Sequence, residues 1–330
     1  MIALAIVRRA ALCAALLSCF VATSFAVAAP LEAVIGVRAS VPQDARTART
    51  LGTDRAGSGI VIDDQGLVLT IGYLVMEAIS ADLILPGNRS VPADIVAYDY
   101  ETGFGLLRAL APLGVTPMPL GNSATLTLDT QAHVPGCSGT GQAKVTGAVV
   151  VSRREFAGYW EYLLPDAIFT APPHFEFGGA ALIGRDGTLL GVGSLIVGDA
   201  GGPERQMPGN MFVPIDALKP ILADMVSTGR SKLPARPWLG ISSEEARGRL
   251  FVTRVAPGGP AAKAGVAAND IIVAVAGDPV TDQADFYRKV WALGNAGTEV
   301  PLTVLNSKGL NEIKITSASR YDHLKLKPSY

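Results

Sequence analysis

Between residues 56 and 215 the apolar positions come in short runs, separated by turns rich in Gly, Pro and Asp. No long segment of this region shows helical periodicity. The runs include 60–62, 68–70, 81–85 and 105–108. Many short strands with frequent turns are typical of paired β-barrels. The pattern therefore predicts a mostly β fold over this part of the chain.

The period changes to that of a helix after residue 215. The apolar positions of one helical stripe are Ile215, Leu218, Ile221, Leu222 and Met225. Side chains at this spacing lie on one face of an α-helix. We expect a helix over 216–227, with Asp216 as its N-cap and Gly229 as its end. The Pro- and Gly-containing segment 229–237 then predicts a linker.

Composition indicates a globular chain with a real core. The 330 residues suggest two or three domains, and 49% of them are hydrophobic. The formal net charge is -1 and no basic cluster is present, which argues against nucleic-acid binding. No motif indicates a cofactor or a metal, so we expect neither.

The N-terminus predicts export. Arg8 and Arg9 precede an almost wholly apolar stretch that ends in small residues at Ala26 and Ala28. This order is typical of a signal peptide over 1–28, and a cleaved product would be periplasmic or secreted. Two alternatives stay open: an uncleaved membrane anchor, or lipidation of Cys19.

Several segments resemble, in order and spacing, the HtrA family of trypsin-like serine proteases. They are 57–63 with 66–70, 120–123, 134–139, 145–152, 186–192 and 211–215. The resemblance implies a trypsin/chymotrypsin-like double β-barrel over 55–228, preceded by an N-terminal arm over 29–54. In HtrA relatives this arm helps to form trimers through apolar and aromatic contacts. Residues 31–54 contain no aromatic residue, which argues against a trimer while leaving other homo-oligomers open.

The resemblance also locates three positions that the family uses for catalysis. Tyr73 stands at the position of the general base, Gly103 at that of the orienting Asp, and Phe177 at that of the nucleophilic Ser. An unperturbed Tyr titrates near pH ~10, so it is a poor base at neutral pH. Gly103 has no side chain to orient a base, and Phe177 has no nucleophilic atom. We expect no catalytic residues at these positions.

The oxyanion hole differs as well. In the family one of its backbone donors belongs to a Gly two residues before the Ser, and this position is Phe175 here. A bulky residue resists backbone conformations that Gly adopts freely. Glu176 would add negative charge where an oxyanion should form.

A hidden active site would need a histidine, and the chain has three: His133, His174 and His323. His133 is expected on a strand, and His323 in a polar tail over 321–330. His174 lies on the same loop as Phe177, where it could be combined with Glu176 and Ser138 in an unorthodox protease site. His174 and Glu176 could also form a metal site in the barrel cleft.

From Trp238 onward the chain resembles a single small α+β PDZ domain of the HtrA kind, over 238–320. The matching segments are 238–241, 252–261, 264–266, 269–275, 285–293 and 300–304. The resemblance implies that an extended peptide adds as a strand beside 241–243, with its terminal carboxylate bound by backbone N–H groups around Leu239, Gly240 and Ile241.

The expected peptide-binding residues continue from this loop to Ser242 and to the groove helix. Phe286 and Val290 would line the pocket for the last side chain of the peptide, or would simply form the core of the small domain. Protein or peptide C-termini are the expected partners, including misfolded envelope proteins. A membrane becomes a partner only if the signal is retained or Cys19 is lipidated.

Cys137 would be the only cysteine after signal cleavage. It is either a reactive thiol, an intermolecular link or a small buried hydrophobe, and we expect the last. The sequence as a whole predicts an HtrA-like pseudoprotease that binds C-terminal or unfolded segments without cleaving them. The alternatives are an active endopeptidase with an unorthodox site and a metal-binding variant of the cleft.

Overall fold

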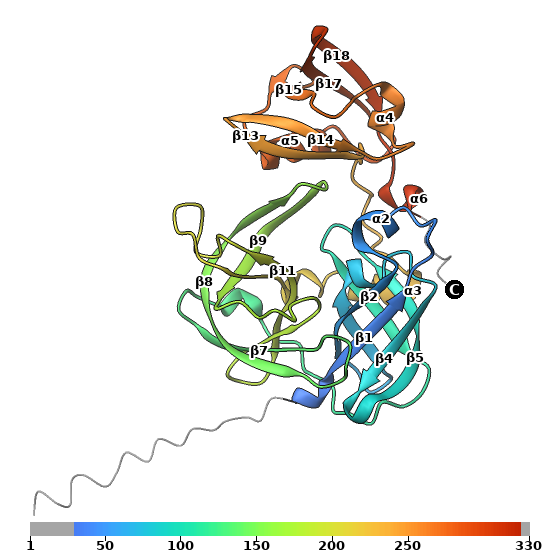
Figure 1. The fold of residues 1–330 in the computed structure, drawn as a ribbon, viewed down its shortest axis with the longest axis vertical. Helices are drawn as coiled ribbons and strands as arrows, with labels where there is room; N and C mark the ends of the chain where they lie inside the picture. The colour runs from blue at the N-terminus through green and yellow to red at the C-terminus, as the bar shows by residue number, and fades with distance from the viewer. Residues whose placement is uncertain (1–29, 325–330) are drawn as a thin grey trace, which may run out of the picture.

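The computed structural model describes residues 30–324, and Figure 1 shows three bodies of strands within them. Two are closed barrels and the third is a smaller sheet domain at the C-terminal end. The predicted signal peptide over 1–28 lies outside the described residues. Within residues 30–324, no helix is both long and apolar enough to span a membrane.

The first barrel closes in the strand order β1-β2-β3-β6-β5-β4. Its strands are β1 (Val34–Ser40), β2 (Asp54–Val61), β3 (Leu67–Ile71), β4 (Ser80–Leu85), β5 (Arg89–Tyr98) and β6 (Phe104–Ala109). Residues 34–40 were expected in an arm outside the barrel. They pair instead with both β2 and β4, so the barrel begins well before residue 55. Apolar side chains of β1 are buried in its core, which is why the strand belongs to the barrel.

The second barrel closes in the order β10-β11-β12-β9-β8-β7. Its strands are β7 (Gln131–Gly136), β8 (Lys144–Gly158), β9 (Tyr162–Ala171), β10 (Ala181–Ile183), β11 (Leu189–Val197) and β12 (Gly209–Pro214). The strands β8 and β9 are long, and their hairpin reaches from the barrel toward the third domain (Figure 1).

The predicted helix over 216–227 forms only in its second half. The chain makes a 3-10 turn, η5 (Ile215–Ala217), and the helix α3 (Leu222–Thr228) follows. Gly229 ends α3 in the left-handed conformation, at φ 75°, as expected. The apolar stripe is nonetheless buried against the barrels.

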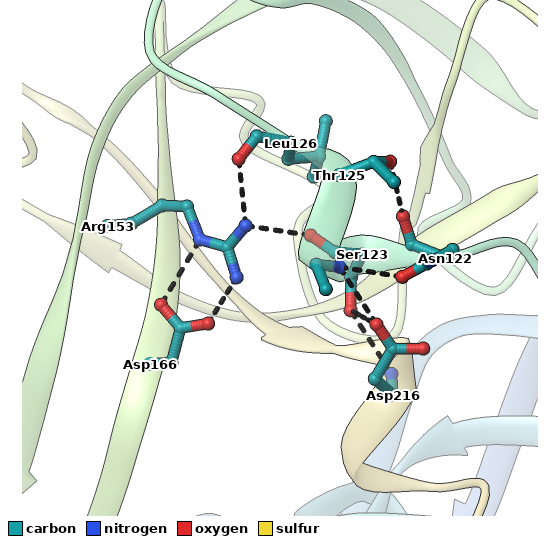
Figure 2. Close-up of polar contacts among 8 residues, drawn as sticks. Asn122, Ser123, Thr125, Leu126, Arg153, Asp166 and Asp216 are labelled. Atoms are coloured by element: carbon teal, nitrogen blue, oxygen red, sulfur yellow. Dashed lines mark hydrogen bonds and ion pairs between the residues drawn. The ribbon is translucent and has the colours of Figure 1, made fainter.

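Asp216 does not cap a helix, because its carboxylate is used elsewhere. It accepts hydrogen bonds from the Ser123 hydroxyl and the Ala124 N–H, both at 2.8 Å, on the turn η4 (Ser123–Thr125). Figure 2 shows this contact beside Arg153, which binds the carbonyls of Ser123 and Leu126. The network ties the connection between the barrels to the start of η5.

The third domain is a sheet in the order β13-β14-β15-β17-β18, with β16 paired to β15. Its elements are β13 (Ile241–Ala246), β14 (Arg249–Val255), α4 (Pro260–Ala264), β15 (Ile271–Val275), β16 (Asp278–Pro279), α5 (Gln283–Ala292), β17 (Glu299–Asn306) and β18 (Gly309–Thr316). The strand β13 is at the edge of the sheet, and the buried residues of α5 join the core of this domain. An edge strand beside a helix leaves a groove where a further strand can add.

The described chain ends in the short helix α6 (Arg320–His323), which returns to the first barrel. The Tyr321 hydroxyl donates to the carbonyl of Tyr98 at 3.1 Å, and its ring lies 4.7 Å from that of Tyr100. The expected polar tail therefore starts as a packed helix. The remaining short elements are η1 (Leu31–Ala33), α2 (Ala48–Leu51), η2 (Gly72–Leu74) and η3 (Pro86–Asn88).

Candidate functional site

Tyr73, on the turn η2, bridges the two barrels. Its hydroxyl donates to the carbonyl of Ser194 on β11 at 3.0 Å. The same hydroxyl lies 2.9 Å from where a Cβ on Gly178 would be, next to Phe177. Burial raises the pKa of Tyr73 far above its ordinary value. Tyr73 is thus a neutral phenol held between the barrels, with its proton engaged by a carbonyl.

Gly103 lies in a turn whose backbone favours glycine. Its φ is +85°, and its carbonyl accepts from the Gly72 N–H at 2.6 Å. A Cβ at this position would lie 3.5 Å from the Tyr162 hydroxyl, which reaches across from β9 and donates to the carbonyl of Thr102 at 2.8 Å. Tyr162 therefore borders the space that an orienting carboxylate at position 103 would need.

The loop around Phe177 keeps tight packing that depends on glycine. A Cβ on Gly193 would lie 2.1 Å from the Phe177 carbonyl oxygen, and Gly179 has a φ of +75°. The Gly178 carbonyl accepts from the Ser58 N–H at 2.8 Å, which joins the loop to the first barrel. Phe175 is 79% exposed.

His174 is buried and holds this loop in shape. Its Nδ1 accepts from the Glu176 N–H at 3.1 Å, so in the neutral ring Nε2 carries the proton and donates to the Lys144 carbonyl at 2.9 Å. Its backbone N–H also donates to the Asn210 side chain at 2.6 Å. Both ring nitrogens are used inside the loop, which is the pattern of a structural histidine.

The side chains of the other members of the alternative sites make no hydrogen bond with this ring in the described residues. Glu176 forms an ion pair with Lys144 at 2.6 Å, and Ser138 is exposed. His133 is exposed on β7, as expected for a strand position, and His323 packs against Trp238 with ring centroids 4.6 Å apart. Across residues 30–324, no cluster of three or more His, Cys, Asp or Glu side chains has the arrangement of a metal site.

Cys137 is buried in the barrel core, which confirms the expectation of a small buried hydrophobe. Burial, together with the nearby Glu176 carboxylate, raises the pKa of its thiol to about 12. At neutral pH the group is a thiol, and thiols are much weaker nucleophiles than thiolates.

The backbone donors of the PDZ loop converge on one carboxylate, that of Glu161 at the tip of the β8–β9 hairpin. The Leu239 N–H donates to Oε2 at 2.9 Å, and those of Gly240 and Ile241 donate to Oε1 at 2.6 and 2.8 Å. Gly240 permits this shape, because its φ is +80°. The three predicted loop residues are thus brought together as an anion-binding nest.

The hairpin also runs along the edge strand. The Ser243 N–H donates to the Tyr159 carbonyl at 3.1 Å, and the register of β13 on β14 shifts between Ser242 and Ser243. The outward-facing backbone N–H is therefore that of Ser243, one residue past the expected Ser242. Gln283 on α5 donates to the Ser243 carbonyl at 2.9 Å and fixes the strand against the helix.

An apolar side chain of the hairpin is also buried in the PDZ domain. Leu163 of β9 is only 8% exposed and packs in the same cluster as Phe286 and Val290, which are fully buried. The two expected pocket residues are therefore part of the small domain's core, in a cluster that also includes a side chain from outside the domain. Burial raises the pKa of Glu161 to about 7, an effect that its backbone donors and Arg320 only partly offset.

Sequence analysis did not single out Glu161, although a signal for it exists. The turn between β8 and β9 spans Tyr159, Trp160 and Glu161, and the third of these has a φ of +57°. Three-residue hairpin loops with a left-handed third residue usually place Gly there. An acidic residue in that place is unusual.

The comparisons with known proteins identify both parts of the chain. Residues 57–192 match the family model of the trypsin-like peptidase domain, and residues 237–316 match that of the PDZ domain. The chain is 26% identical over 277 residues to the periplasmic pH-dependent serine endoprotease DegQ of Escherichia coli strain K12, covering 79% of this chain and 58% of the relative. It is 28% identical over 306 residues to the chloroplastic Protease Do-like 1 of Arabidopsis thaliana, covering 86% and 68%.

Solved structures show the same fold. The HtrA-type protease AlgW with decapeptide matches with a TM-score of 0.53 at 20% identity, over 92% of this chain and 98% of that one. A serine endoprotease from Yersinia pestis matches with a TM-score of 0.53 at 22% identity, over 89% and 96%. The chain spans 58–68% of the length of the curated relatives named above.

Proposed function

We propose that this chain, a member of the HtrA family that joins a trypsin-like peptidase domain to one PDZ domain, binds protein C-termini or unfolded segments without cleaving them. One observation carries the proposal: the backbone donors of Leu239, Gly240 and Ile241 hold a carboxylate, that of Glu161. A loop that binds one carboxylate with three N–H groups has the chemistry to bind the terminal carboxylate of a peptide.

The bound peptide would extend the sheet of the PDZ domain. Its backbone would pair with the outward N–H of Ser243, as the Tyr159 carbonyl does, and its last side chain would enter the apolar cluster that Leu163 shares with Phe286 and Val290. Because the donors belong to the backbone, affinity depends little on the peptide's sequence before its last residues. The proposed ligands are therefore polypeptides with a free, apolar C-terminus.

A peptide pair tests this function. A peptide with a free C-terminal leucine should bind in the micromolar range of a small interface, and its C-terminally amidated form should lose most of that affinity. Fluorescence polarisation with the full chain measures both. Equal affinity for the two forms would show that the nest does not bind the terminus.

The absence of cleavage is supported by the cleft. Tyr73 offers a buried, neutral phenol whose proton is held by the Ser194 carbonyl, and position 177 has no nucleophilic atom. His174 has both ring nitrogens engaged, which argues against its service as a base for an unorthodox site. Incubation with casein and labelling by a fluorophosphonate probe test this. Casein cleavage that disappears on mutation of a residue in the cleft would overturn the proposal.

We further propose that the protein acts outside the cytoplasm. The support is the signal-like order of residues 1–28, together with relatives whose names place them in the periplasm. Mass spectrometry of the product from an exporting host should give a chain that begins near Ala29. A mass that includes Met1 would indicate a retained anchor instead, and an acylated Cys19 would indicate a lipoprotein.

A further inference from the structure

The groove that a peptide would use is filled by the chain itself. Glu161 occupies the three donors of the carboxylate loop, and the Tyr159 carbonyl occupies the Ser243 N–H on the edge strand. Leu163 occupies the apolar cluster beside α5. These are the three kinds of contact by which a groove recognises an extended C-terminus: carboxylate, strand pairing and apolar anchor.

The backbone of Glu161 supports a specific role for this side chain. Its φ of +57° is uncommon for a residue with a side chain and is strained. Gly would adopt it without strain. The burial of a carboxylate is also costly unless it is hydrogen-bonded. The three charge-assisted bonds that the loop donates offset part of both costs.

Further contacts hold the hairpin in the groove from both sides. The Tyr287 hydroxyl of α5 donates to the Gly158 carbonyl at 2.8 Å and accepts from the Glu161 N–H at 3.2 Å. On the other side, the Arg320 guanidinium of α6 donates to the Trp160 carbonyl at 3.2 Å. All three turn residues of the hairpin, 159–161, therefore form hydrogen bonds with the C-terminal part of the chain.

We propose that the β8–β9 hairpin is an internal ligand of the PDZ domain, in which the Glu161 carboxylate takes the place of a peptide's terminal carboxylate. The inference rests on the proposed peptide-binding function and adds a regulation to it. A polypeptide with a free, apolar C-terminus binds only after it displaces the hairpin. The apparent affinity is reduced by the fraction of molecules in which the groove is open.

A substitution at Glu161 tests the internal ligand without changing the loop that binds its carboxylate. Glu161→Gly removes the carboxylate and relieves the left-handed backbone, so the turn should still form. Asp129→Gly is the matched control, because Asp129 is an exposed acid at a φ of 63° on the second barrel. Glu161→Gln keeps the length of the side chain while it removes the titrating group, and serves as the reference for the dependence on pH.

Two measurements on the full chain are made for each variant. In fluorescence polarisation with a labelled peptide ending in a free leucine, Glu161→Gly should bind at least about tenfold tighter than the unchanged chain, and Asp129→Gly should not differ. In hydrogen exchange without peptide, the amides of residues 239–241 should exchange faster in Glu161→Gly alone.

The outcomes separate the two proposals. Equal peptide affinity and equal amide protection in Glu161→Gly and the unchanged chain would overturn the internal ligand while leaving peptide binding in place. Faster exchange in Glu161→Gly without peptide binding by any variant would support the internal ligand and overturn the proposed function.

Discussion

The barrel cleft and the PDZ loop differ in the groups from which a site at each place would be built. A serine protease site is built from side chains, and the three positions that matter here are Tyr73, Gly103 and Phe177. The PDZ loop is built from the backbone N–H groups of 239–241, which still converge on a carboxylate. A site of the first kind depends on residue type at a few positions, whereas a site of the second kind depends on the shape of its loop.

Both regions are also occupied by the chain's own groups, but with different consequences. The Tyr73 hydroxyl is bonded to Ser194 between the two barrels, so its removal would disturb their contact. Glu161 belongs to a hairpin tip that enters the groove from another domain. Under our proposal, a competing carboxylate replaces it without unfolding either domain.

The largest expected effect concerns restoration of the triad. The triple variant Tyr73→His, Gly103→Asp, Phe177→Ser should remain at least about 10⁴-fold below an active HtrA protease in casein cleavage, because restored side chains contribute fully only when they are held in the working geometry. Asp at position 103 would meet a φ of +85° and the Tyr162 hydroxyl, and the oxyanion loop still carries Phe175. Strong cleavage by this variant would show that the cleft, like the nest, keeps its working shape.

The second effect compares a buried phenylalanine in the PDZ domain with an exposed one on the barrel loop. Phe286→Ala should destabilise the PDZ domain by about 3–5 kcal/mol, because Phe286 is fully buried. Phe175→Ala on the barrel loop should change stability by no more than about 0.5 kcal/mol, since Phe175 is 79% exposed. Calorimetry on the full chain measures both. Similar losses would mean that Phe175 is buried in solution.

The third effect tests whether the nest depends on its glycine. Gly240→Val should weaken binding of a free-leucine peptide by roughly 10–100-fold, because a Cβ at a φ of +80° is strained and would lie 3.0 Å from the Ala256 side chain. Gly248→Val is the control, since Gly248 has a φ of +68° in open space outside the nest. Equal affinities for the two variants would contradict a glycine-dependent nest.

The smallest effect is a dependence on pH. Burial raises the pKa of Glu161 from 4.5 to about 7 in the docked hairpin, against a smaller opposing effect of its donors and Arg320; Tyr287 is the other titratable group beside it. An acid with a higher pKa in the docked state stabilises docking fully below its free pKa, and that contribution is lost as the pH rises through the docked value. The open fraction should rise roughly tenfold between pH 6 and pH 8.

Hydrogen exchange of residues 239–241, corrected for the intrinsic effect of pH, measures this change. Glu161→Gln has no titrating group at this position and should show a flat profile. An open fraction that falls with rising pH would reverse the assignment of burial as the dominant cause.

Much of the fold and part of the site followed from local patterns. The short apolar runs between 56 and 215 became barrel strands, and Gly229 ended α3 as expected. The segments that resemble the PDZ domain lie within its matched range, and those that resemble the trypsin-like domain do so except for 211–215, which follows the matched range 57–192. Local pattern did not predict the start of the barrel, because β1 belongs to it through its pairing with β2 and β4. It also failed for the first half of the helix after residue 215, because Asp216 binds Ser123 instead of capping a helix.

The sequence by itself determined which atoms are absent from positions 73, 103 and 177 and which loop carries the anion-binding backbone, because both depend on residue type at positions located by local motifs. Only the tertiary structure decided what fills that loop. Glu161 is 78 to 80 residues away from its three donors, and in the sequence it is one acid in a hairpin turn. Its partner is set by how the second barrel packs against the PDZ domain, and no periodicity or propensity within the turn encodes that packing.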